Sequence, residues 1–131
     1  MLLYTSGLFS LLHRDEPQNG RAMELYAQAH RRLTHSYVLA ELIPLAQVRG
    51  LSRALVLNFS LRALDGDEVE VVWVDEPLHR QALSLLQARR DKGYSLCDAV
   101  SFVLMRERGI REALTTDKHF VQEGFTRLLE P

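Results

Sequence analysis

The segment Ala113-Leu114-Thr115-Thr116-Asp117-Lys118-His119-Phe120 decides the fold more than any other part of the chain. Its first four residues are predicted to form a short strand, and residues 118–122 to form one or two helical turns. Asp117 stands between the two, where an aspartate can cap the short helix. A strand followed directly by a helix is the repeating unit of α/β proteins, whose parallel strands are joined by helices.

Further strands are predicted on both sides of this segment. The apolar run from Leu2 to Thr5 is typical of a buried strand, and residues 69–74 form the clearest strand because they are rich in β-branched residues. Residues 126–129 are predicted to form a last short strand. Residues 34–36 are compatible with a short strand or with a connector.

Helices are predicted wherever apolar residues recur at helical spacing between these strands. Ser6 and Ser52 are expected to cap two of them, Pro44 to bend one, and Gly109 to end another. The predicted helices cover residues 7–13, 21–33, 37–48, 55–64, 77–91 and 95–108. Strands and helices in this order predict an α/β fold with a mostly parallel sheet of four to five strands, flanked by helices, in a single domain over residues 1–131. Trp73, Phe102, Phe120 and Phe125 are expected in its core.

The composition places the chain among globular proteins. It has 131 residues, 47% of them hydrophobic and 25% charged, with a net charge of −1. These values argue against a disordered chain and against a histone-like coat on nucleic acid. The only cysteine, Cys97, excludes an internal disulfide and is expected in the core. We find neither a signal peptide nor an apolar run long enough to span a membrane, so a soluble cytoplasmic protein is expected, with no membrane partner.

Three carboxylates stand where a charge is costly without a partner. Glu41 shares a helical stripe with apolar residues, which predicts partial burial; Asp98 lies in the first turn of a helix; Asp117 follows a strand. Each also has a purely structural explanation. Glu41 can be an edge glutamate, Ser95 and Asp98 have the spacing of a capping box, and Asp117 can be an N-cap.

Considered together, the three acids favour a metal site. Mg²⁺ prefers carboxylate and water oxygens, and carboxylates that lie close together repel one another unless a cation joins them. A divalent ion held in this way can orient a phosphodiester and activate water for its hydrolysis. The carboxyl ends of parallel strands are where ligands of α/β proteins bind.

The chain resembles a known family, the PIN domains, and in particular the VapC-like toxin nucleases of type II toxin–antitoxin systems. The resemblance spans nearly the whole chain. It is most specific in Ser95-Leu96-Cys97-Asp98-Ala99-Val100-Ser101-Phe102 and in the segment from Leu114 to Phe120. Weaker matches are Leu2-Leu3-Tyr4-Thr5-Ser6, Ala40-Glu41-Leu42 and Gly124-Phe125.

The resemblance implies a PIN-like three-layer α/β/α fold and a metal-dependent endoribonuclease that hydrolyses single-stranded RNA. It further implies that Glu41, Asp98 and Asp117 hold Mg²⁺ or Mn²⁺, and that Ser6 and Thr116 are polar positions beside this site. A homodimer and a small antitoxin protein as partner are also implied.

Tyr4 departs from the family pattern, which has an aspartate at this position. A phenol is neutral at pH 7 and is a poor ligand for Mg²⁺, so weaker metal binding and slower cleavage are expected. Tyr4 is expected in the core, although it could stack on a base instead. The alternative function is a catalytically degenerate PIN fold that binds RNA or protein. His119 is expected to be exposed or to cap a helix rather than to act as a general base.

Overall fold

The computed structural model describes all residues from Met1 to Pro131. Five strands form one sheet in the order β3-β2-β1-β4-β5, and every neighbouring pair is parallel. The prediction of a mostly parallel sheet is therefore confirmed. The strands are β1 (Leu2–Leu3), β2 (Leu33–His35), β3 (Glu70–Val72), β4 (Glu112–Leu114) and β5 (Thr126–Arg127).

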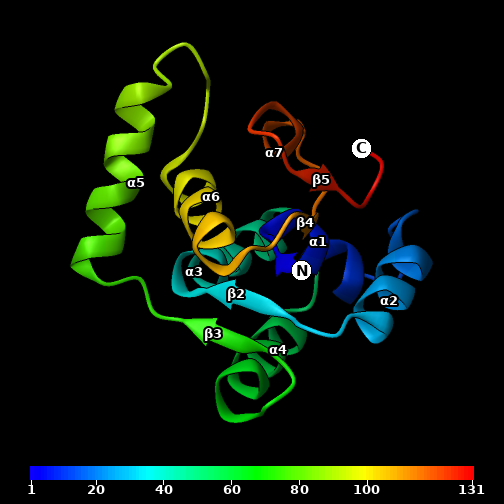
Figure 1. Cartoon of the computed structure of the whole chain (residues 1–131). Helices are drawn as coiled ribbons and strands as arrows, with labels where there is room; N and C mark the ends of the chain where they lie inside the picture. The colour runs from blue at the N-terminus through cyan, green and yellow to red at the C-terminus, as the bar shows by residue number, and fades with distance from the viewer.

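Seven helices flank the sheet in two groups (Figure 1). The first group joins β1 to β2 and β2 to β3, and the second joins β3 to β4 and β4 to β5. Parallel strands are joined by right-handed crossovers, so a reversal in the direction of the connections moves the helices to the other face. The first group is α1 (Thr5–Leu12), α2 (Asn19–Gln28), α3 (Ser36–Val48) and α4 (Arg53–Asp65); the second is α5 (Glu76–Ala88), α6 (Leu96–Arg108) and α7 (Lys118–Gln122).

The central strands are buried because helices cover both faces of the sheet. Leu2, Leu3 and Leu114 have no exposed surface, as expected for residues of a covered parallel sheet. Phe102 and Phe120 are equally buried and pack edge to face, with 5.0 Å between ring centroids. Burying one such ring stabilises the fold by roughly 1.5–3 kcal/mol.

Gly7 sets the close approach of α1 to β4. A Cβ atom built on Gly7 would lie 1.8 Å from the carbonyl oxygen of Leu114, which is far inside van der Waals contact. Only glycine therefore lets the first turn of α1 lie against the end of β4. This contact brings the neighbouring Ser6 to the carboxyl end of that strand.

Several predicted boundaries were wrong. The helix predicted over residues 21–33 ends at Gln28, because Leu33 pairs with Leu2 in the sheet and residues 33–35 form β2. Ser6 does not cap α1, which begins at Thr5 without a side-chain cap. The last strand covers only Thr126 and Arg127.

Other local predictions are confirmed. The Ser52 hydroxyl accepts a hydrogen bond from the Leu55 N–H as the N-cap of α4, and Gly109 ends α6 in the left-handed conformation with φ 64°. Pro44 lies inside α3, where the bend expected from it stays a prediction. Of the predicted core residues, Phe125 is half-buried and stacks on Phe102. Trp73 was placed wrongly, because it follows the edge strand β3 and is 66% exposed.

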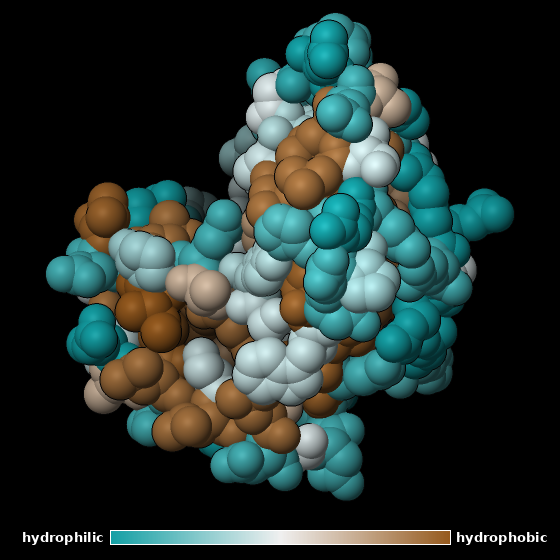
Figure 2. All heavy atoms as spheres, turned by 90° about the vertical axis from the view of Figure 1, so that its left-hand side faces the viewer, coloured by the Kyte–Doolittle hydropathy of each residue, from teal (hydrophilic) through white to brown (hydrophobic).

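The surface carries apolar side chains beside this edge of the sheet. Figure 2 shows the face that includes α4, β3 and α5, with apolar residues gathered over its lower part. Exposed members of α4 and its surroundings include Leu55, Leu57, Leu61, Leu64 and Trp73. No helix combines the length and the apolar character that crossing a bilayer requires.

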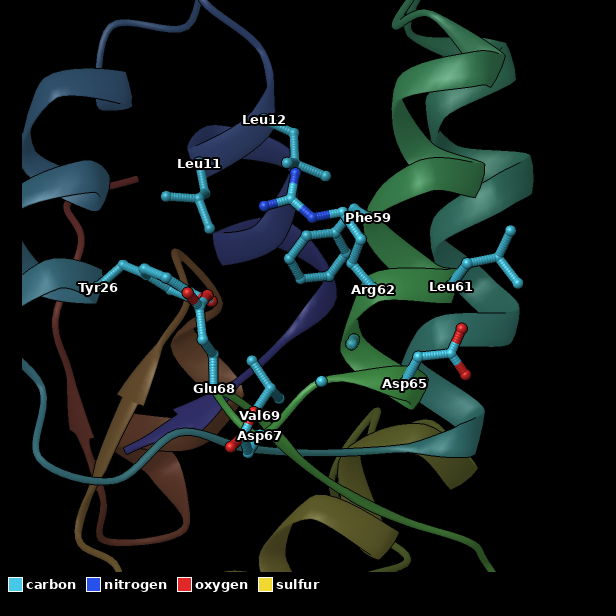
Figure 3. A pocket seen from close by; sticks show the side chains of 12 residues that line it. Leu11, Leu12, Tyr26, Phe59, Leu61, Arg62, Asp65, Asp67, Glu68 and Val69 are labelled. Atoms are coloured by element: carbon cyan, nitrogen blue, oxygen red, sulfur yellow. Dashed lines mark hydrogen bonds between the residues drawn. The ribbon is translucent and has the colours of Figure 1, made fainter.

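A hollow of about 600 Å³ lies where α1, α2 and the C-terminal half of α4 meet (Figure 3). Its wall is mainly apolar, with Leu11, Tyr26 and Phe59 among its residues, and Asp67 and Glu68 lie on the segment that closes it. None of its lining residues belongs to the polar pocket described next.

Candidate metal centre

A polar pocket lies at the carboxyl end of the central strands β1 and β4. The register pairs Leu3 with Leu114, so Tyr4 and Thr115 follow the two strands side by side, and the Tyr4 N–H donates to the Leu114 carbonyl at 3.2 Å. The connection after β1 leads to one side of the sheet and the connection after β4 to the other. Such a switch point is where α/β proteins place their ligands.

The pocket has a volume of about 490 Å³ and brings together residues from four parts of the chain. Glu41, Asp98 and Asp117, which the sequence singled out, all line it. Tyr4 and Ser6 line it as well, whereas Thr116 does not. The other lining residues are Thr5, Leu45, Gly93, Ser95 and His119.

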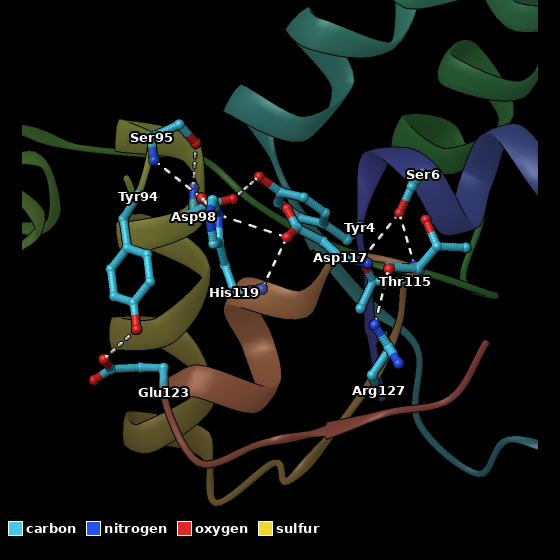
Figure 4. A network of polar contacts seen from close by, with 11 residues as sticks. Tyr4, Ser6, Tyr94, Ser95, Asp98, Thr115, Asp117, His119, Glu123 and Arg127 are labelled. Carbon is cyan, nitrogen blue, oxygen red and sulfur yellow. Dashed lines mark hydrogen bonds and ion pairs between the residues drawn. The ribbon is translucent and has the colours of Figure 1, made fainter. Parts of the chain in front are cut away.

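Asp98 has the most contacts in the pocket (Figure 4). Its Oδ1 accepts a hydrogen bond from the Tyr4 hydroxyl. Its Oδ2 lies 3.0 Å from the Ser95 backbone nitrogen and 2.9 Å from Nδ1 of His119. The Ser95 hydroxyl in turn accepts from the Asp98 N–H, which completes a capping box at the start of α6. Asp98 is therefore a helix cap and a pocket residue at once, and its side chain is only 3% exposed.

Tyr4 is both a core residue and a wall of the pocket. Its ring packs edge to face on Phe120, with 4.7 Å between centroids, and the residue is 6% exposed. Burial, together with the charges of Cys97 and Asp98, raises the pKa of the Tyr4 phenol far above its usual value. The hydroxyl is thus a neutral donor to Asp98. The predicted core position is confirmed, and a ring buried in this way is not free to stack on a base.

Asp117 caps α7 and faces the same pocket. Its Oδ1 accepts a hydrogen bond from the His119 backbone N–H at 2.9 Å. Its own N–H donates to the Thr115 hydroxyl at 3.0 Å. The predicted N-cap is confirmed, and one carboxylate oxygen remains beyond the capping contact.

Ser6 and Thr115 fasten the chain beneath Asp117. The Ser6 hydroxyl lies 2.9 Å from the Thr115 hydroxyl and accepts the Thr116 N–H at 3.0 Å. Thr115 is fully buried, and its hydroxyl contacts Ser6 and accepts the Asp117 N–H, whereas the side chain of Thr116, the polar position expected from the sequence, does not line the pocket. Thr116 contributes only its backbone, which also accepts from Arg127 at 3.4 Å.

His119 lies in the pocket, so the prediction of an exposed or capping side chain was wrong. Its side chain is 22% exposed, and Nδ1 lies 3.5 Å from Oδ1 of Asp117 as well as 2.9 Å from Asp98. The Tyr94 ring packs against the imidazole with 5.2 Å between centroids. The sequence offered only the position of His119, two residues after Asp117, as a signal.

Glu41 reaches the pocket from α3 and is more open than predicted. It is exposed rather than partly buried, and Oε2 lies 3.5 Å from the Thr5 hydroxyl. The stripe that predicted burial continues on either side of it, since Val38 and Leu42 are fully buried. Burial and the negative charge of Glu41 raise the pKa of the Cys97 thiol, which agrees with an unreactive core cysteine.

Behind the pocket, Glu123 at the end of α7 anchors this helix to α6 and to the segment that joins α5 to α6. Its side chain is 2% exposed and accepts hydrogen bonds from Arg89, Tyr94 and Arg106, the shortest at 2.6 Å from Arg106. Burial alone would raise the pKa of Glu123, but the hydrogen bonds from Arg106, Arg89 and Tyr94 lower it. The sequence analysis missed this residue.

The donor atoms of the pocket fit a divalent cation. One atom each from Asp98, Asp117 and His119 lie within 4.8 Å of one another, and Glu41 adds a carboxylate to the same pocket. Carboxylate oxygens suit Mg²⁺ and Mn²⁺, and imidazole suits transition metals. No lysine or arginine lines the pocket. A cation would therefore offset charge that no side chain of the pocket offsets.

Comparison with known proteins also indicates a nuclease. The chain is 32% identical over 125 residues to the 23S rRNA-specific endonuclease VapC20 of Mycobacterium tuberculosis, in each of two strains, covering 95% of this chain and 94% of that protein. It is also similar to the crystal structure of Mycobacterium tuberculosis VapC20, described as a sarcin–ricin loop cleaving toxin. The TM-score is 0.85 with 30% identity, over 99% of this chain and 98% of that one.

The PIN domain family model matches residues 1–125. The parallel sheet with helices on both faces agrees with the PIN-like α/β/α fold of VapC20. The chain therefore belongs to the PIN domain family.

Proposed function

We propose that this protein is a metal-dependent endoribonuclease of the VapC type, which hydrolyses phosphodiester bonds of single-stranded RNA. The observation that carries the proposal is the meeting of Glu41, Asp98 and Asp117 in one pocket at the switch point of the sheet. The close similarity to an RNA endonuclease over nearly the whole chain supports it.

Each side chain of the pocket has its own role in this proposal. Asp98 and Asp117 hold Mg²⁺ or Mn²⁺, and Glu41, at the open side, binds the ion or orients water beside it. When bound, the ion supplies the positive charge that orients the phosphodiester and offsets charge on the leaving oxygen. Ser6 and Thr116 support the site by holding the backbone that precedes Asp117, through the bond from the Thr116 N–H to the Ser6 hydroxyl. Tyr4 fixes the orientation of Asp98.

The relative suggests a first substrate. VapC20 is named for cleavage of 23S rRNA, and its structure for cleavage of the sarcin–ricin loop. We propose an RNA of this kind, with unpaired bases displayed in a loop, as the substrate of this chain as well.

The partners follow from the family resemblance. We propose a homodimer, a small antitoxin that blocks the pocket, and a cytoplasmic location for a single PIN domain. Exposed apolar side chains on α4, such as Leu57 and Leu61, support a protein contact on that face, because clustered apolar surface marks interaction sites.

The test is cleavage of a sarcin–ricin loop RNA with Mn²⁺ or Mg²⁺, with and without chelator. Asp117→Asn is the sharpest variant, because asparagine keeps the N-cap oxygen for the His119 N–H while removing the charge. We expect an unchanged melting temperature without metal and a rate lower by at least about a hundredfold. Glu107→Gln, an exposed position of α6 outside the pocket, is the control. Equal cleavage by Asp117→Asn and the wild type would exclude the proposed role.

A degenerate PIN module is the second candidate function. It is favoured by the bond from Tyr4 to Asp98, since this bond uses a carboxylate oxygen that a metal could otherwise take. Binding of RNA without cleavage, at Mn²⁺ concentrations that saturate the pocket, would support this alternative.

A further inference from the structure

We propose that Nδ1 of His119 is a direct ligand of the divalent ion, so that the centre has one nitrogen donor beside its carboxylates. The inference rests on the proposed function, because it concerns the ion of that same pocket. It goes further by adding a ligand and by predicting which class of metal the pocket prefers.

The spacing of three atoms carries the proposal. Nδ1 of His119 lies 2.9 Å from Oδ2 of Asp98 and 3.5 Å from Oδ1 of Asp117. Adjacent ligands around an octahedral ion at about 2.1 Å lie about 3 Å apart. All three atoms lie within 4.8 Å of one another, so one ion can contact them together after small rotations of the side chains.

Tyr4 sets which oxygen of Asp98 faces His119. The Tyr4 hydroxyl donates to Oδ1 and holds this oxygen against the pocket wall. The other oxygen, Oδ2, accepts the Ser95 N–H and lies beside His119, so an ion bound at Nδ1 would meet this oxygen. With a phenol at position 4 in place of a carboxylate, the imidazole is the nearest further donor to Asp98 and Asp117.

The surroundings of His119 hold its ring in this orientation. The backbone N–H of His119 donates to Asp117, and the Tyr94 ring packs on the imidazole at 5.2 Å. The Tyr94 hydroxyl is itself fixed by Glu123 at 3.0 Å. An ion held at Nδ1 would leave the ring proton on Nε2, the ring nitrogen that is not bound to the metal.

A nitrogen ligand changes the preference for metal. Mg²⁺ takes oxygen ligands, whereas imidazole suits transition metals such as Zn²⁺ and Ni²⁺; Mn²⁺ shares the oxygen ligands of Mg²⁺ but, as a transition metal, accepts a nitrogen ligand more readily than Mg²⁺ does. We therefore expect the pocket to bind Mn²⁺ more tightly than Mg²⁺. His119→Gln should lower Mn²⁺ affinity by about tenfold to a hundredfold and Mg²⁺ affinity by less.

The deciding experiment is electron–nuclear double resonance of Mn²⁺ bound to the full chain, with histidine labelled by ¹⁵N. We expect the hyperfine coupling of a directly bound nitrogen, which changes from ¹⁴N to ¹⁵N character with the label. It should persist in His30→Gln, the control at an exposed histidine, and should be lost in His119→Gln. Circular dichroism shows that each variant is folded.

Three outcomes would overturn the inference, and the first two separate it from the proposed function. Saturable Mn²⁺ binding and RNA cleavage without nitrogen coupling would refute the ligand and leave the nuclease intact. A coupling that survives in His119→Gln would also refute it. Absence of any saturable Mn²⁺ binding, together with absence of cleavage, would overturn both.

Discussion

The Tyr4 hydroxyl donates a hydrogen bond to Oδ1 of Asp98, and so joins the end of β1 to the start of α6, 94 positions further along the chain. This bond fixes the rotation of the carboxylate. Oδ1 points into the wall formed by Tyr4, and Oδ2 points toward His119 and the capped N-terminus of α6. Position 4 therefore controls which oxygen of Asp98 is available in the pocket.

Replacing Tyr4 by aspartate should strengthen the metal site. A second carboxylate beside Asp98 adds an oxygen ligand, and we expect RNA cleavage with Mg²⁺ to rise by about tenfold or more, equivalent to roughly 1.4 kcal/mol. Without metal, the two neighbouring carboxylates repel and the packing of the Tyr4 ring on Phe120 is lost, so the variant should melt at a lower temperature, which Mn²⁺ raises by removing the repulsion. Cleavage assays and thermal melts with and without Mn²⁺ measure both effects.

Tyr4→Phe is the matched control for this change, because it removes the hydroxyl without adding a carboxylate. If it accelerates cleavage as much as Tyr4→Asp does, then release of Asp98, and not the new ligand, is the cause. If neither variant changes metal binding, Tyr4 does not influence the centre.

Gly7→Ala should destabilise the protein by about 3 kcal/mol or more, because a new Cβ would collide with the backbone of β4. Gly20→Ala, inside α2 with nothing near its Cβ, should instead stabilise by about 0.5–1 kcal/mol. Urea denaturation measures both. Similar stabilities of the two variants would contradict the close packing of α1 on β4.

Glu123→Gln should cost about 3 kcal/mol, the lower end of the range for breaking a buried pair, since Arg89 and Arg106 keep access to water. Because the pKa of Glu123 is lowered in the folded protein, its stabilising effect is present above its ordinary pKa and is lost as the pH falls below it. The variant should therefore lose less stability on acidification than the wild type. Glu24→Gln, which breaks an exposed pair with Arg21, should change stability by less than about 1 kcal/mol.

His35 should make folding sensitive to mild acid. The residue has no exposed surface, its Nδ1 has no hydrogen-bond partner, and burial lowers its pKa to about 3. Ser101 donates its proton to the Cys97 carbonyl at 2.9 Å, so Nε2 of His35 is the donor in the 2.8 Å contact with Ser101. The histidine is therefore buried in its neutral form.

In the unfolded chain, His35 becomes protonated near pH 6.5. In the folded protein its pKa of about 3 keeps the imidazole neutral until the pH falls to about 3. The contribution of neutral His35 to the free energy of unfolding is therefore fully present above pH 6.5. It declines as the pH falls, by about 1.4 kcal/mol per pH unit between pH 6 and 4. Denaturation at pH 7, 6 and 5 should show a shallower decline for His35→Asn than for the wild type. His30→Asn should retain the wild-type slope, because His30 is exposed.

Local signals predicted most of the architecture. The capping box of Ser95 and Asp98 and the N-cap at Asp117 depend on residues a few positions apart, so they could be identified from the sequence. The strand at residues 33–35 was predicted only as one of two alternatives over residues 34–36, and its first residue was missed, because Leu33 continues the helical spacing of α2 and becomes a strand by pairing with Leu2. Long-range pairing outweighed local periodicity there.

In the pocket, too, local features could be predicted from the sequence and long-range contacts could not. Glu41, Asp98 and Asp117 were found from charge in an apolar or strand-end setting. His119 and Glu123 were misjudged or missed, because their partners are distant in the sequence: Asp98 lies 21 positions from His119, and Arg89 lies 34 positions from Glu123. A histidine or glutamate on a short helix has no local feature that reveals such contacts.

Asp98 is both the cap of α6 and a carboxylate of the pocket, and this combination limits which substitutions the domain can tolerate. A substitution that removes the Asp98 carboxylate also removes the cap of α6, so it should lower the stability of the fold together with the activity. A change at position 4 carries no such penalty, because an aromatic ring there adds packing against Phe120. Position 4 can therefore vary, and alter the metal site, without weakening the start of α6.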